Sequence, residues 1–142
     1  MPQVEQEKKQ LLDLATDFND FIKKNGWVSR YDTESDALSI TKPTLSEDAR
    51  IKYFDDKVAF YITDNNKVEG VFVEYFKSNF IKHHTGSGSK KMEKALDKLE
   101  KNQKEDESLV NVDMKQVRGM AFDLQEAIKT SLATRLDLAT GL

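Results

Sequence analysis

The N-terminal part of the chain has the hydrophobic pattern of an amphipathic helix. Between residues 3 and 25, apolar residues recur every three or four positions, which places them on one helical face. These residues are Val4, Leu11, Leu14, Ala15, Phe18, Phe21 and Ile22. Gly26 follows them, and glycine tolerates the left-handed conformation that commonly ends a helix. The pattern therefore predicts one helix over 3–25.

The pattern then changes to alternation between residues 27 and 82, a stretch that holds ten of the chain's thirteen aromatic residues. Alternating apolar and polar positions, separated by turns rich in Asp and Asn, are typical of short antiparallel strands. Strands are expected at 27–31, 37–41, 51–54, 58–63 and 68–75, with a helical turn at 77–82. This part of the chain predicts an antiparallel meander of four to five strands.

The remainder of the chain is expected to be helical. Residues 85–89, Thr-Gly-Ser-Gly-Ser, have the composition of a flexible joint. Residues 90–106 form a charged helix with a narrow apolar stripe, and a second helix is predicted from Met114 to Ala139, weakened near its start by Gly119. The fold class is therefore α+β: an N-terminal helix, the sheet and two C-terminal helices.

This pattern divides the chain into three parts. A helix-and-sheet domain is expected at 1–84, a flexible joint at 85–89 and a helical arm at 90–142. The arm is too polar to be stable alone, because each surface ion pair on a helix contributes only about 0.2–0.5 kcal/mol. We therefore expect the arm to mediate homo-oligomer formation, with a dimer as the commonest closed form.

Composition and charge limit the classes of function. The chain has 142 residues, of which 38% are hydrophobic and 33% charged, and a formal net charge of −3. No segment has the excess of lysine and arginine that binding to duplex DNA requires. The absence of cysteine excludes disulfides and thiolate metal sites. The sequence shows neither a signal peptide nor a membrane-spanning run, so we expect a cytoplasmic protein without membrane contact.

One hairpin carries a recognisable motif, formed by Tyr31, Asp32, Glu34, Asp36, Ala37, Leu38 and Ile40. The spacing Tyr-Asp-x-Glu-x-Asp-Ala-Leu resembles a small bacterial domain family of unknown function, and the resemblance extends over residues 30–75. It implies a small antiparallel sheet. The family has no assigned catalytic residues, so the resemblance implies nothing about activity.

Three patterns that suggest ligand chemistry do not meet its requirements. Asp32, Glu34 and Asp36 match the first ligands of a calcium loop, but the sixth position is alanine and the twelfth is proline. His83 and His84 are adjacent, so their side chains point in different directions. The glycines of residues 86–90 lack the spacing of a phosphate-binding loop. No cofactor or metal is therefore expected.

The aromatic residues of the sheet are the strongest candidates for a binding site. Alternation suggests that Tyr53, Phe60 and Tyr75 lie on a different face from Phe54, Tyr61 and Phe72. One face is then core, and the other is covered by helices or by another subunit, or it stacks on nucleic-acid bases. The candidate site residues are Tyr53, Tyr61, Phe72 and Tyr75, together with Arg50, Arg118 and Arg135.

These observations favour a non-catalytic interaction, regulatory or assembly protein that forms homo-oligomers and binds a protein partner. A module that binds a nucleotide or single-stranded nucleic acid through the aromatic residues is the alternative. A small hydrolase is the weakest interpretation, because the sequence shows no nucleophile paired with a base.

Overall fold

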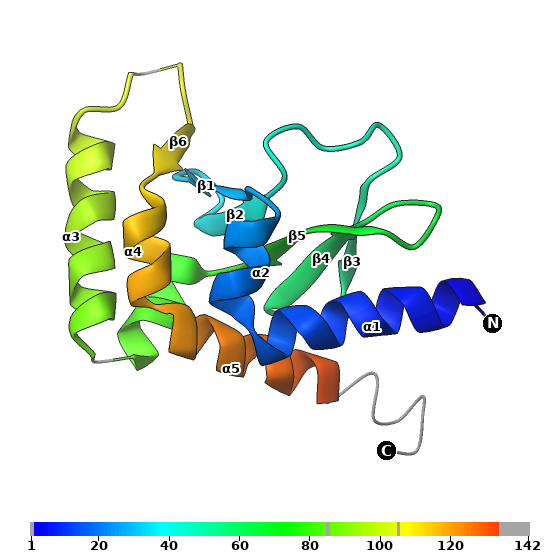
Figure 1. Cartoon of the computed structure of the whole chain (residues 1–142). Coiled ribbons are helices and arrows are strands. Elements are labelled where there is room, and N and C mark those ends of the chain that lie inside the picture. The colour runs from blue at the N-terminus through cyan, green and yellow to red at the C-terminus, as the bar shows by residue number, and fades with distance from the viewer. Residues whose placement is uncertain (1, 85, 105, 134–142) are drawn as a thin grey trace.

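A computed structural model describes residues 2–84, 86–104 and 106–133. It has the predicted α+β architecture, with an antiparallel sheet of six strands and with helices before and after it (Figure 1). The strands are β1 (Val28–Asp32), β2 (Ala37–Thr41), β3 (Arg50–Tyr53), β4 (Val58–Ile62), β5 (Val68–Val73) and β6 (Leu109–Val112). Their order across the sheet is β3-β4-β5-β2-β1-β6.

A buried glutamate holds the loop that connects β2 to β3. Strand β5 pairs with β2, so the loop from β2 carries the chain past β5 and β4 to start β3 at the far edge. Glu69 is only 1% exposed, and its carboxylate accepts hydrogen bonds from the amide and hydroxyl of Ser46 and from Nζ of Lys42. Burial alone would raise the pKa of Glu69, but these donors hold it below its usual value. Glu69 therefore anchors the loop that leads to the exposed edge strand.

The N-terminal helix is divided into α1 (Pro2–Thr16) and α2 (Phe18–Lys24) at Asp17. The amide of Phe18 donates to the side-chain oxygen of Gln125 at 3.1 Å, which provides a partner at the break. Gly26 has a φ of +63° and follows the end of α2, as the sequence predicts. The break lets the apolar residues of both helices face the same core.

The C-terminal segment differs from the expected arm. Helix α3 (Ser87–Lys101) begins within the predicted joint at 85–89, and β6 adds to β1 as a sixth strand of the same sheet. The predicted helix from Met114 is divided at Met120 into α4 (Met114–Gly119) and α5 (Ala121–Leu132), and its expected end at Ala139 lies outside the described residues. Helix α5 packs along α1. The described part of 90–142 thus packs with the helix-and-sheet domain.

A close approach of two helices explains the glycine in the predicted joint. A Cβ atom on Gly88 would lie 2.1 Å from the backbone oxygen of Gly119. Only glycine permits this approach of α3 to α4, so Gly88 is a packing residue rather than a linker residue.

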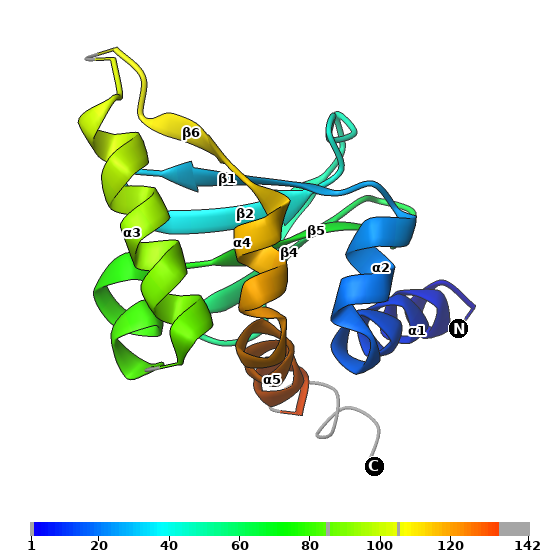
Figure 2. The same cartoon turned by 60° about the vertical axis from the view of Figure 1, so that its left-hand side comes forward.

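All the helices lie on one side of the sheet (Figure 2). A π-helical turn, η1 (Phe76–Phe80), and a short 3₁₀ helix, η2 (Ile81–His83), connect β5 to α3, and they confirm the predicted helical turn. The core lies between the sheet and the helices. Its largest fully buried side chains are Leu11, Leu14, Phe18, Ile22, Tyr31, Leu38, Ile40, Phe60, Phe76, Met92, Leu96 and Met120. Within residues 2–84, 86–104 and 106–133, the opposite face of the sheet carries no helix.

Candidate functional site

The motif of the β1–β2 hairpin has a structural role. Both carboxylate oxygens of Asp36 accept hydrogen bonds, from the Tyr31 hydroxyl at 2.6 Å, the Lys77 amide at 2.8 Å and the amide and hydroxyl of Ser78. Asp36 has a φ of +56°, a conformation that Asp and Asn tolerate best among residues other than glycine. The Asp32 carboxylate accepts hydrogen bonds from the backbone amides of Glu34 and Ser35 in the turn that follows it. The motif therefore joins the hairpin to η1.

These hydrogen bonds shift the pKa values of Asp36 and Tyr31. Burial alone would raise the pKa of Asp36, but the donors from Ser78, Tyr31 and the backbone hold it below its usual value. Burial and the Asp36 carboxylate raise the pKa of Tyr31. Both oxygens of Asp36 are thus engaged by the chain itself.

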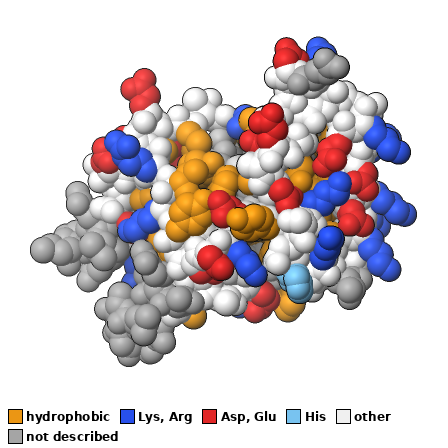
Figure 3. All heavy atoms as spheres, turned by 180° about the vertical axis from the view of Figure 1, so that it is seen from behind, with side chains coloured by type: hydrophobic (Ala, Val, Ile, Leu, Met, Phe, Trp, Pro, Cys, Tyr) orange, Lys and Arg blue, Asp and Glu red, His pale blue; other side chains and the backbone are white. Residues whose placement is uncertain are grey.

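The uncovered side of the sheet carries a cluster of exposed apolar and aromatic side chains (Figure 3). Tyr53 lies opposite Ala59, which in turn lies opposite Phe72, and Ile51 lies opposite Tyr61. Residues opposite one another in antiparallel strands share a face. We call this cluster the aromatic face and define it as Ile51, Tyr53, Tyr61, Phe72 and Tyr75.

Two rings of the aromatic face contact each other, and the face as a whole is incompletely covered. The rings of Tyr61 and Phe72 meet edge to face at 6.3 Å, and both are partly buried. Ile51 and Tyr53 are each 43% exposed, and Tyr75, which follows β5, is 54% exposed. The Tyr53 hydroxyl donates to Glu74 at 2.5 Å, and this bond and burial raise the pKa of Tyr53 to about 12.

The expected division of the aromatic residues between the two faces holds for Phe60 against Tyr61 and Phe72, but it is wrong for Tyr53 and Phe54. Tyr53 shares a face with Tyr61 and Phe72, whereas Phe54 and Phe60 are buried on the helical side. The cause is the turn after β3, which places Tyr53 opposite Ala59. Sequence spacing alone leaves this register open.

The arginines predicted as site residues do not join the aromatic face. Arg30, which was not among them, does lie on the uncovered side of the sheet, because it is opposite Ser39 and Ser39 is opposite Phe72. Arg50 lies opposite Ile62, on the side of the sheet that faces the helices, and Arg118 lies in α4. Arg135 lies outside the described residues. Lys52 also points to the helical side, where its Nζ lies 3.2 Å from a carboxylate oxygen of Glu7. Arg50, Arg118 and Lys52 therefore do not surround the aromatic rings.

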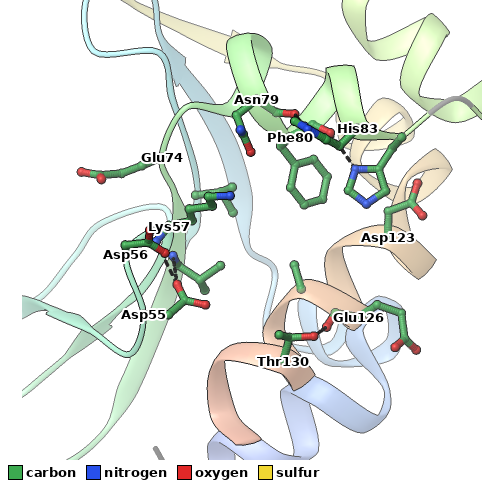
Figure 4. Close-up of a pocket in the computed structure, with 14 residues that line it drawn as sticks. Asp55, Asp56, Lys57, Glu74, Asn79, Phe80, His83, Asp123, Glu126 and Thr130 are labelled. Carbon is green, nitrogen blue, oxygen red and sulfur yellow. Dashed lines mark hydrogen bonds between the residues drawn. The ribbon is translucent and has the colours of Figure 1, made fainter. Parts of the chain in front are cut away.

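A groove beside the aromatic face could not be predicted from the sequence (Figure 4). It has a volume of about 470 Å³. The β3–β4 turn and the end of β5 form one side of it, and η1, the end of η2 and α5 form the other. Its apolar lining is Val58, Val73, Phe80 and Ala127. Its carboxylates are Asp55, Asp56, Glu74, Asp123 and Glu126, and the remaining lining residues are Lys57, Asn79, His83, His84 and Thr130. We call it the acidic groove.

The two histidines of the groove contact the backbone of η1. Nδ1 of His83 lies 2.7 Å from the carbonyl oxygen of Asn79, and Nδ1 of His84 lies 2.6 Å from that of Phe80. A carbonyl only accepts, so each Nδ1 carries the hydrogen. Within the described part of the chain, neither histidine is hydrogen-bonded to a hydroxyl or a carboxylate.

No protein family, curated protein or solved structure matches the chain in sequence or structural comparisons. Among the described residues, no three histidine or carboxylate side chains converge closely enough to hold a metal ion. None of the helices in residues 2–84, 86–104 and 106–133 has both the length and the apolar character to cross a membrane. The candidate sites therefore rest on the geometry alone.

Proposed function

We propose that this protein is a non-catalytic interaction protein that forms homo-oligomers through the aromatic face and also binds a protein partner. The observation that carries the proposal is the uncovered side of β3, β4 and β5, where Tyr53 is 43% and Tyr75 54% exposed. Tyrosine is enriched at protein interfaces because its ring buries a large apolar area at a low cost in conformational entropy.

The edge strand β3 adds a second reason for association. All four of its residues are exposed, and no strand of the described chain pairs with its outer edge. An open edge offers unpaired backbone groups to another chain, and proteins usually protect such edges. A second copy that covers β3 would also cover Ile51 and Tyr53, since both lie on that strand.

A base-stacking surface has less support. Single-stranded nucleic acids are bound by aromatic rings together with cations that track the phosphates. Tyr53 instead donates to the carboxylate of Glu74, and Arg50 and Arg118 lie away from the rings. Arg30 shares this side of the sheet, but its guanidinium donates to the carbonyl oxygen of Pro43. A hydrolase has less support still, because both histidines donate from Nδ1 to backbone carbonyls.

Light scattering after gel filtration tests the proposal, with the wild type compared to the double variant Ile51→Thr/Phe72→Thr. We expect an oligomer for the wild type and a monomer for the variant, because threonine suits a strand but removes the apolar contact. Leu109→Thr is the matched control, since Leu109 is 52% exposed on the opposite edge strand. A monomeric wild type, or an oligomer that only Leu109→Thr disrupts, would contradict the proposal.

A further inference from the structure

We propose that the acidic groove binds a basic segment of a protein partner, with a lysine or arginine side chain entering between α5 and the β3–β4 turn. The inference depends on the proposed function only in that the partner is a protein. It names the chemistry that this partner presents, and it concerns a groove that adjoins the aromatic face but shares no lining residue with it.

The charge of the groove favours a cation. Five carboxylates and one lysine line it, which leaves a formal charge of −4 with both histidines neutral. The side-chain carboxylates of Asp56 and Asp123 accept no hydrogen bond and form no ion pair within the described part of the chain. A concave, partly apolar surface that is lined by negative carboxylates raises the local concentration of cations.

The lining of the groove suits an extended side chain better than a small ion. Val58, Val73 and Phe80 are buried and form an apolar wall, against which the methylene stem of lysine or arginine can pack. The carboxylates come from opposite sides of the groove, with Asp55 and Asp56 on the β3–β4 turn and Asp123 and Glu126 on α5 (Figure 4). Arginine in particular presents several donors that can reach separate carboxylates.

Apolar side chains flank the groove, and they favour a peptide over a free amine. Glu74 lines the groove and accepts the hydrogen bond of Tyr53, so the groove adjoins the aromatic face. Phe122 is 74% exposed, and it lies one helical turn before Glu126 on α5. A bound segment can therefore bury apolar residues next to its basic residue, as protein interfaces commonly do.

The test is fluorescence anisotropy with labelled peptides of one length, which carry arginine, glutamine or glutamate at the same positions in a Gly-Ser-Leu background. We expect binding of the arginine peptide only, and weaker binding when NaCl is raised from about 50 mM to about 300 mM. The variant Asp123→Asn/Glu126→Gln should raise the Kd roughly four- to 25-fold, because each of the two partly exposed ion pairs contributes a factor of about two to five.

The matched control is Glu47→Gln/Asp64→Asn, which removes the same charge from the end of β4 that lies away from the groove. It should leave the Kd within about twofold, since charges farther apart than a Debye length are largely screened. An equal effect of both double variants would show that the binding depends only on the net charge of the protein, and it would overturn the inference. Equal binding of the glutamine peptide, or no binding of the arginine peptide, would also overturn it.

Failure of this inference is distinguishable from failure of the proposed function. Ile51→Thr/Phe72→Thr changes the aromatic face and leaves the groove residues in place. A monomeric wild type that still binds the arginine peptide in the groove overturns only self-association. An oligomer that shows no arginine-peptide binding overturns only the groove assignment.

Discussion

Replacing Gly88 by alanine tests whether residues 85–89 are a joint or part of the packed interior. The added Cβ would lie 2.1 Å from the backbone oxygen and 2.8 Å from the carbonyl carbon of Gly119. Backbone atoms cannot rotate away, so α3 and α4 must separate. Overpacking of this kind costs about 3 kcal/mol at the upper end of the usual range, and alanine recovers up to about 1 kcal/mol in helix propensity. We expect a net loss of about 2 kcal/mol in the free energy of unfolding.

Urea denaturation followed by the fluorescence of Trp27 measures this loss, because Trp27 is the chain's only tryptophan and is 4% exposed. Gly86→Ala is the matched control. A Cβ there meets nothing within 4 Å, and the expected cost is at most about 1 kcal/mol from a weaker helix cap. A flexible joint would instead be stabilised by about 0.4–1 kcal/mol through the unfolded state. A Gly88→Ala protein as stable as the wild type would refute the packing argument.

Three further predictions concern carboxylates and one tyrosine. Asp36→Asn keeps a residue that tolerates the positive φ but removes the charge, so we expect a loss of about 1–3 kcal/mol near neutral pH. Because the folded pKa of Asp36 lies below the unfolded one, its contribution is present above pH 4 and is lost as the pH falls through the folded pKa. The acid limb of the stability curve should therefore be shallower in the variant; an unchanged acid limb would contradict this assignment. Glu69→Ala removes the anchor of the loop after β2 and should lower the unfolding free energy by about 2–3 kcal/mol in a thermal melt; a change below about 0.5 kcal/mol would show that Glu69 does not hold the loop. Glu74→Gln should lower the pKa of Tyr53 from about 12 towards its ordinary value in an NMR titration of the tyrosine rings, and an unchanged value would exclude the hydrogen bond to Glu74 as its cause.

Much of the fold could be predicted because its signals are local. The alternation between residues 27 and 75 identified five of the strands, and Gly26 marked the end of the N-terminal helical region. The sixth strand could not be predicted from local pattern. Leu109–Val112 is a short run among polar residues, and its strand conformation depends on pairing with β1, far away in the sequence.

The candidate sites were predictable only in part, because they depend on register and on distant contacts. Tyr53, Tyr61 and Phe72 were identified as candidates, but their common face follows from the β3–β4 register. The groove combines a turn near Asp56, the end of β5 and the first turns of α5, which no sequence spacing relates. Gly88 resembled a linker residue because its partner, Gly119, lies in a different helix.

The most direct test of self-association through the aromatic face uses single cysteines. The chain has no cysteine of its own, so Ile51→Cys introduces the only thiol, and Leu109→Cys provides a matched thiol on the opposite edge strand. Both positions are exposed in the single chain, at 43% and 52%. Thiol modification is measured at low and at high protein concentration. The account predicts that modification of Ile51→Cys slows as the concentration rises while that of Leu109→Cys stays constant; equal rates for both thiols at every concentration would contradict it.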